Sequence, residues 1–304
     1  MKLLITGGTG FIGQELLKHL ASYEIVALTR DVEHAKKRLS HINDTTLSFL
    51  TSLDDLHDLN GFDAIINLAG EPIASKRWSK TQKKHITHSR WSITERLVEL
   101  IHASTTPPSI FISGSAVGYY GDQQFHPFDE SLHVNQSGFP HQVCEKWESI
   151  AKRARSEHTR VCIIRTGLVL HPTGGALLKM LPAYKCGIGG SIGSGKQYMP
   201  WIHMTDMVRA IIHLLDTPHA DGPFNLTAPH PVTNAHFSRM LAKTLGRPHF
   251  LFTPKWLIRL LLGESSTLLL DSTRCKPKKL TDLGFHFNYS RIEPAFKNLL
   301  QPYN

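Results

Sequence analysis

Short apolar runs alternate with amphipathic stretches along the first 170 residues. Between the runs, apolar residues recur at helical spacing in stretches such as 80–103 and 139–155. Short β-rich runs separated by helices are typical of parallel strands joined by crossover helices. The pattern therefore predicts an α/β fold, a doubly wound parallel sheet, whose strands include the runs KLLIT, EIVALTR, DAIINLAG, SIFISGS and RVCIIRTGLVL.

The alternation ends in a glycine-rich stretch between residues 171 and 200. Its segment GIGGSIGSGKQYMPW is too rich in glycine for regular structure and predicts an ordered loop, of the kind that often carries function. A helical MTDMVRAIIHLLD, a strand-like PFNLTA and a helix over 233–245 follow. We expect the strand and helix near 200–228 to return to a first domain of residues 1–170, with residues 171–304 forming a second, smaller part.

Composition narrows the class of protein. The chain has 304 residues, 41% of them hydrophobic and 19% charged, which suits a globular protein with a sizeable core. Its apolar runs fall far short of the roughly 20 residues of a membrane span, and the N-terminus lacks the apolar core of a signal peptide. Four scattered cysteines indicate neither a disulfide framework nor a zinc ribbon. We therefore expect a cytoplasmic protein with no membrane partner.

The formal charge of +9 is spread along the chain, with its densest cluster in SKRWSKTQKK at 75–84. That cluster is either a phosphate-binding surface or the solvated face of a helix and its preceding loop. Because no motif combines stacking aromatics with basic residues, we expect no nucleic-acid partner.

The first strand leads into a glycine triplet. Gly7, Gly10 and Gly13 stand between an apolar strand and a helix with a buried face. The first glycine permits a tight turn, the second lets the backbone approach a pyrophosphate, and the third lets helix and strand pack closely. The pyrophosphate then sits at the helix N-terminus. This predicts a dinucleotide site that also includes Thr9, Phe11 and Ile12.

The second strand ends in Thr29 and Arg30, where an NAD site would carry an acidic residue on the adenosine ribose. An arginine there can instead pair with a 2′-phosphate. We therefore expect NADP(H) in preference to NAD(H). The neighbouring Asp31 weakens this inference, and a plain surface arginine is the alternative.

Motifs along the whole chain resemble those of the extended short-chain dehydrogenase/reductases, the NAD(P)-dependent epimerase and dehydratase family. They are TGGTGFIG, NLAG at 67–70, ISGSAVGYYG at 112–121, RTGLVL at 165–170 and, in one epimerase-like branch, GGAL and GSGKQYMPWIH. The resemblance implies a Rossmann-type cofactor domain and a small C-terminal domain at about 247–300. It also implies further cofactor-lining residues, namely Leu68, Ala69, Gly70, Arg90 and Val169.

Hydride chemistry in that family uses a serine, a tyrosine and a lysine, and Ser115 fits the serine position. The Tyr-x-x-x-Lys pair should open the helix at 139, but one register gives Pro140 and Cys144 and the other gives Phe139 and Val143. Neither register supplies a phenol or an amine. The phenol would be needed because its pKa near 10 is tuned toward neutrality for proton transfer, and the charge of the amine lowers that pKa.

Three other groups are candidates for the missing chemistry. Glu71 follows a strand at the carboxyl edge of the sheet, where ligands bind in such folds. His203 has a pKa suited to proton transfer. Cys144 is a nucleophile if its thiol is acidified, although a buried and inert cysteine is the commoner case. His85 and His88 share a helical spacing, but without a third ligand we expect no metal.

Residues near the glycine-rich loop complete the expected site. Substrate contacts are assigned to Trp78, Tyr120, Gln197 and Trp201, with core packing as the equal alternative for the three aromatic residues. We expect an NADP(H)-binding protein that acts on a small polar substrate, nucleotide-linked substrates included. The alternative is a binding module in which NADP(H) stabilises or signals without turnover, since a fold alone does not establish an activity. The sequence does not specify the oligomeric state.

Overall fold

A seven-stranded sheet forms the centre of the protein in the computed structural model, which describes residues 1–40, 42 and 46–300. Every neighbouring pair of strands runs parallel. The order across the sheet is β11 (Gly222–Leu226), β6 (Arg160–Thr166), β5 (Ile110–Ala116), β4 (Ala64–Asn67), β1 (Lys2–Thr6), β2 (Glu24–Leu28) and β3 (Leu47–Leu50). This confirms the doubly wound α/β fold of Rossmann type.

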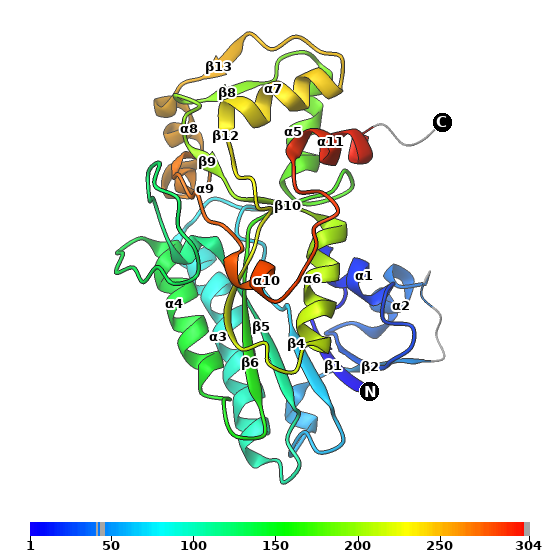
Figure 1. The fold of residues 1–304 in the computed structure, drawn as a ribbon. Coiled ribbons are helices and arrows are strands. Elements are labelled where there is room, and N and C mark those ends of the chain that lie inside the picture. The colour runs from blue at the N-terminus through cyan, green and yellow to red at the C-terminus, as the bar shows by residue number, and fades with distance from the viewer. Residues whose placement is uncertain (41, 43–45, 301–304) are drawn as a thin grey trace.

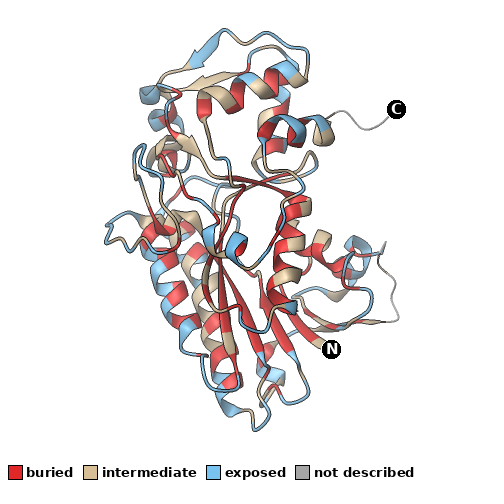
Figure 2. Ribbon diagram, viewed as in Figure 1, coloured by how far each residue is buried: buried red, intermediate tan, exposed pale blue. Residues whose placement is uncertain are grey.

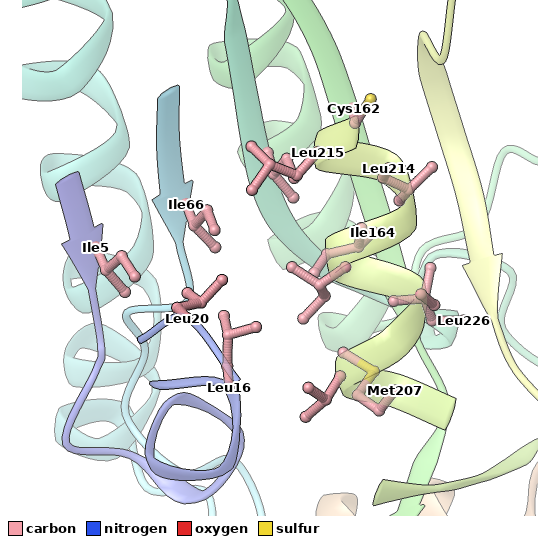
Figure 3. Close-up of a cluster of buried hydrophobic side chains, with 14 of the residues drawn as sticks. Ile5, Leu16, Leu20, Ile66, Cys162, Ile164, Met207, Leu214, Leu215 and Leu226 are labelled. Carbon is pink, nitrogen blue, oxygen red and sulfur yellow. The ribbon is translucent and has the colours of Figure 1, made fainter. Parts of the chain in front are cut away.

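Helices cover both faces of this sheet (Figure 1). One face packs α1 (Phe11–Leu17), α2 (Val32–Arg38) and α6 (Met204–Asp216), and the other packs α3 (Lys80–Ala103) and α4 (Phe139–Lys152). Successive strand residues point to opposite faces, so Leu3 and Ile5 join one core while Leu4 joins the other. Figure 3 shows the first of these cores, where Leu16 and Leu20 lie beside Ile66.

A third hydrophobic core lies beyond the carboxyl edge of the sheet. It is built by Leu170, Trp201, Phe237 and Phe296, among others. The elements around it are β7 (Leu168–Leu170), α5 (Gly175–Lys185), β8 (Gly190–Ile192), β9 (Tyr198–Met199), β10 (Trp201–His203), β12 (Val232–Thr233), α7 (Asn234–Thr244), β13 (Leu251–Thr253), α8 (Lys255–Leu262) and α11 (Ile292–Leu300).

Short elements complete the chain, and side-chain caps start several helices. The remaining pieces are η2 (Leu53–Asp55), η3 (Val117–Tyr119), η4 (Gly263–Ser266), α9 (Thr267–Leu270) and α10 (Lys278–Asp282). The Ser79 hydroxyl accepts the backbone N–H of Gln82 and so begins α3, and Thr233 begins α7 in the same way. Among the described helices, none combines the length and the apolar character that crossing a bilayer requires.

The strand order reverses between β1 and β4, and the two carboxyl ends there are joined by buried hydrogen bonds. The Thr6 hydroxyl donates to the Asn67 side chain at 2.6 Å, and the Asn67 amide donates to Thr94 at 2.9 Å. Open α/β sheets bind ligands at such a switch point. The fold therefore places the candidate site above β1, β4 and β5.

Candidate functional site

Gly7 and Gly13, at the turn after β1, have no room for a side chain. Gly7 has a φ of +71°, and a Cβ placed on it would lie 2.6 Å from the Leu68 carbonyl. A Cβ on Gly13 would lie 2.3 Å from the Gly7 oxygen, and Gly10 precedes α1 without a side-chain cap. The turn thus leaves its backbone N–H groups uncapped by side chains, as a pyrophosphate cradle requires. A dinucleotide fits this geometry.

Three further residues of this turn have separate contacts. The Thr9 carbonyl accepts the Gln14 side-chain amide at 2.7 Å, and Ile12 packs against the sheet core. Phe11 lies against a second glycine pair, because a Cβ on Gly174 would approach its ring to 2.3 Å. Phe11 therefore ties the glycine turn to the start of α5.

At the end of β2, Arg30 and Asp31 have different contacts. The Asp31 carboxylate accepts the backbone N–H of His34 at 2.9 Å and so caps α2. The Thr29 hydroxyl donates to the Asp31 carbonyl at 3.1 Å, and Arg30 and Asp31 are both exposed. Because the Asp31 carboxylate is engaged in the helix cap, Arg30 is the residue of the two that can meet an anionic group.

Arg90, which belongs to α3, contacts the loop after β4 at the switch point. A Cβ on Gly70 would lie 2.9 Å from the Arg90 guanidinium carbon, and that guanidinium lies over the Trp147 ring at 5.3 Å. It donates to the carbonyls of Ile86 and Glu71, each at 3.0 Å. Burial lowers the pKa of Arg90 from its ordinary value. Leu68 and Ala69 line the same loop, partly and fully buried.

Glu71 lies in this corner as well. Its backbone N–H donates to the Ser89 hydroxyl at 2.9 Å, and its carboxylate accepts a long 3.4 Å bond from Gln82. Its carbonyl is the one that holds Arg90. The carboxylate is therefore weakly held and beside a cation, which leaves it free to act on a ligand.

The structure decides between the two registers of α4. Pro140 and Cys144 face the end of β5, since a Cβ on Gly118 would lie 3.1 Å from the Pro140 Cβ and 3.9 Å from the Cys144 sulfur. Phe139 instead packs edge-on against Trp78, and Val143 lies in the same apolar cluster. Pro140 and Cys144 are thus the pair that faces the carboxyl end of β5, whereas Phe139 and Val143 face the apolar cluster.

Cys144 does not supply the missing reactivity. Burial, followed by the charge of Glu148, raises the pKa of its thiol to about 11. A thiol with that pKa is neutral near pH 7 and is a poor nucleophile. The structure therefore supports the inert alternative for this cysteine.

A buried polar network connects the ends of β5 and β6 with α4. The Ser115 hydroxyl donates to the Glu148 carboxylate at 2.8 Å, and Arg165 donates two hydrogen bonds of 2.8 Å to the same carboxylate. Arg165 also donates to the Tyr120 hydroxyl, which in turn donates to Asn225, both at 2.8 Å. A hydroxyl has one proton to donate. Ser115 donates it to Glu148 in this structure, so the hydroxyl has no second proton for a hydrogen bond to a substrate carbonyl.

Sequence reasoning missed Arg165 and the role of Glu148. Arg165 interrupts the apolar strand RVCIIRTGLVL, and a buried strand can hold a cation only beside a buried partner. That conflict is a signal in the sequence, and it points to a carboxylate on a packed helix. Glu148 is that carboxylate, one turn after Cys144 on the same face of α4.

Three of the expected site residues are buried and held by protein groups. Tyr120 is fully buried in the network, and burial raises the pKa of its phenol. Trp201 is fully buried in the third core and donates its indole N–H to the His230 carbonyl. His203 caps α6: its Nδ1 accepts the Thr205 N–H, and its Nε2 bonds Asn298.

The environment of His203 disfavours the protonated form of its imidazole. Its ring stacks on Tyr289 with centroids 3.8 Å apart, and burial lowers its pKa to about 4. The imidazole is therefore neutral, and both of its nitrogens are engaged by protein groups. It borders a hollow of about 200 Å³ with Glu15 and His171, formed by α1, α6 and α11.

The other assigned residues differ in what their contacts allow. Gln197 is buried and donates to two carbonyls, yet its Oε1 has no partner among the described residues. Trp78 is buried and donates its indole N–H to Ile73 at 2.9 Å. Val169 pairs with Ile202 between β7 and β10 and is core. His85 and His88 belong to no metal-binding group of three within the described part of the chain.

Comparison with known proteins agrees with this geometry. The sequence profile of the "NAD dependent epimerase/dehydratase family" matches residues 3–227, and that of a domain of unknown function, DUF1731, matches residues 253–299. The chain is 38% identical over 302 residues to "Epimerase family protein SH2119" of Staphylococcus haemolyticus, covering 98% of this chain and 99% of the relative.

Two solved structures share the fold. Human epimerase family protein SDR39U1 (isoform 2), crystallised with NADPH, is 30% identical with a TM-score of 0.88, and all of both chains is covered. UDP-glucuronic acid 4-epimerase from Bacillus cereus, in complex with UDP-glucuronic acid and NAD, is 17% identical with a TM-score of 0.77 over 98% of each chain.

Proposed function

Because the chain belongs to the NAD dependent epimerase/dehydratase family, we propose that it binds NADP(H) in preference to NAD(H) and acts on a small polar substrate beside it. The chain is an NAD(P)-dependent epimerase-like protein of Rossmann fold. When bound, the nicotinamide accepts or gives a hydride. The cofactor would lie on the turn Gly7 to Gly13 and reach along Leu68 to Gly70.

The observation that carries the cofactor preference is the engagement of Asp31 in the α2 cap, with Arg30 exposed beside it. A carboxylate facing the ribose would repel a 2′-phosphate, whereas a guanidinium binds one with two parallel donors. The human relative was crystallised with NADPH, which supports the same preference.

The substrate would lie between the carboxyl edge of the sheet and the glycine-rich stretch that contains the short strands β8 and β9. Arg90 would hold an anionic group, Glu71 would move a proton, and Gln197 would accept a hydrogen bond at its unpartnered Oε1. The Bacillus cereus 4-epimerase binds a nucleotide-linked sugar, so such sugars are among the substrates we propose.

A second candidate function is a non-catalytic NADP(H)-binding regulatory or sensor module. The hydrogen bond from Ser115 to Glu148 favours it, because it removes the donor that would polarise a carbonyl. Pro140 has no proton to give, and the Cys144 thiol stays neutral. On this proposal Ser115, Pro140 and Cys144, which correspond to the family's serine, tyrosine and lysine, do not catalyse hydride transfer.

Turnover distinguishes the two candidates. We would purify the protein, load it with NADPH or NADP⁺, and follow reduced-nicotinamide absorbance with UDP-glucose, UDP-glucuronic acid and a panel of small aldehydes and ketones. Product isomers would be resolved by chromatography, because an epimerisation leaves no net change in the cofactor.

The enzyme proposal expects turnover with at least one substrate, lost in Glu71→Gln and kept in Glu99→Gln, an exposed carboxylate on α3. Cofactor binding with no product across the panel would establish the binding module. A Glu71→Gln variant as active as the parent would remove Glu71 from the mechanism.

The cellular setting and domain division belong to the same proposal. We propose a cytoplasmic location, a cofactor domain of residues 1–170 together with the strand and helix near 200–228, and no nucleic-acid partner. Cys144, Cys162 and Cys275 are buried as free thiols, which suits a reducing compartment. Cell fractionation tests the location, and retention of nucleic acid on filters at physiological salt would contradict the last point.

A further inference from the structure

Most of the exposed large apolar side chains in the described part of the chain lie on one short segment, which we call the β13–α8 face. Its residues are Phe250, Leu251, Phe252, Trp256, Leu260 and Leu261. The other exposed large apolar side chains are those of Met1, Phe125, Leu178, Ile188 and Leu268. Phe250, Phe252, Trp256 and Leu260 are between 66% and 75% exposed.

Two pairs of these side chains each share one side of the segment, whereas Leu251 and Leu261, each one residue along from a member of a pair, point to other sides. Phe250 and Phe252 are two residues apart in an extended segment, so both project to the same side. Trp256 and Leu260 are four residues apart on α8, so they share one helix face. Only Pro254 separates the strand from the helix, and Figure 2 shows β13 and much of α8 in the exposed colour.

The stretch of chain that contains this face carries charges of one sign. The stretch 222–263 contains no aspartate or glutamate and five basic residues, namely Arg239, Lys243, Arg247, Lys255 and Arg259. Lys255 and Arg259 are exposed on α8 itself. The first acid beyond the stretch, Glu264, is held by Lys83 at 2.5 Å. The β13–α8 face is therefore apolar and aromatic with a cationic border.

We propose that the β13–α8 face binds the surface of an anionic lipid bilayer. Tryptophan, phenylalanine and leucine bury their apolar bodies at the headgroup level, while lysine and arginine pair with acidic lipids. The helix has eight residues, which is about 12 Å at 1.5 Å per residue, so it lies in the interface and does not cross it.

Charge also argues against the alternative that a second copy covers this face. The stretch 222–263 offers no acidic residue to pair with Lys255 and Arg259 of a second copy, so a twofold contact would bring basic residues of the two copies together, and like charges across an interface cost free energy. The proposal revises the sequence expectation of no membrane partner. That expectation rested on the length of apolar runs, and interfacial binding needs no spanning length.

Co-sedimentation with vesicles tests the proposal. We expect the protein to bind vesicles of phosphatidylcholine mixed equally with phosphatidylglycerol, to bind phosphatidylcholine alone much less, and to dissociate as salt is raised. The double variant Trp256→Ser with Leu260→Ser should partition at least about a hundredfold less, since each side chain contributes roughly tenfold. Lys255→Glu with Arg259→Glu should abolish the preference for anionic vesicles.

Phe125→Ser is the matched control, because it removes an exposed aromatic side chain outside the face. All variants change exposed side chains, and unchanged thermal melting would verify that they remain folded. Vesicle binding that is absent, or that survives the Trp256 and Leu260 changes, overturns the proposal. So does a dimer in size-exclusion chromatography that those two changes dissociate while the wild type ignores vesicles.

Discussion

Glu148 is predicted to be essential for stability because it neutralises a buried cation. Its side chain is 1% exposed and that of Arg165 is 3% exposed, and two hydrogen bonds of 2.8 Å join them. Glu148→Gln keeps the shape but leaves the guanidinium charge without its counter-charge. Removing one partner of a buried ion pair costs about 3–5 kcal/mol. The loss also includes the hydrogen bond from Ser115.

Urea unfolding followed by tryptophan fluorescence would measure this cost at constant m-value. Glu145→Gln is the control one turn earlier on α4, since its side chain is 60% exposed and 3.6 Å from His141. It should change the free energy of unfolding by less than about 0.5 kcal/mol. The double variant Glu148→Met with Arg165→Met should be more stable than Glu148→Gln, because it leaves no unpaired charge.

A cost below about 1 kcal/mol for Glu148→Gln would refute this reasoning. It would mean that water or another group compensates Arg165 in solution, and that the Ser115 proton is not committed as the structure indicates. The argument for a non-catalytic module would then lose its basis.

Two further predictions concern titratable groups. At about pH 8 a disulfide reagent should label one thiol in the native protein, the exposed Cys186, because Cys144, Cys162 and Cys275 are buried. After unfolding it should label all four. Rapid labelling of a second thiol in the native protein would contradict this prediction. Burial and the neighbouring Asp122 raise the pKa of Asp271 to about 6, so its favourable contribution is present at low pH and lost as the pH rises through that value. Asp271→Asn should therefore stabilise the protein at about pH 7.5, by on the order of 1 kcal/mol after allowance for solvent screening, and not at about pH 4; an equal effect at both pH values would rule out this titration.

Local signals in the sequence predicted the sheet. The alternation of apolar runs and helical stretches gave the parallel strands, and the range 80–103 coincides with α3. The tight turn at Gly7 follows from a missing Cβ, which is a property of the residue itself. Such features are determined within a few residues of chain, so a single sequence contains them.

The environments of aromatic and polar side chains could not be read in that way. Tyr120 and Trp201 look like pocket residues in their motifs, yet each is buried by contacts from segments far along the chain. The register of α4 was open because Pro140 and Phe139 differ by one position. Only the approach of Pro140 and Cys144 to Gly118 decides it.

The affinity of the protein for the two reduced cofactors tests the central claim most directly. Hydrogen bonds to a charged group contribute about 1.5–3 kcal/mol, so Arg30 should favour NADPH over NADH by roughly ten- to a hundredfold in Kd. Calorimetric titration should show this preference in the wild type and in Arg38→Ala, an exposed base at the other end of α2, and its loss in Arg30→Ala with NADH binding unchanged. Equal Kd values for NADH and NADPH in the wild type would contradict the account.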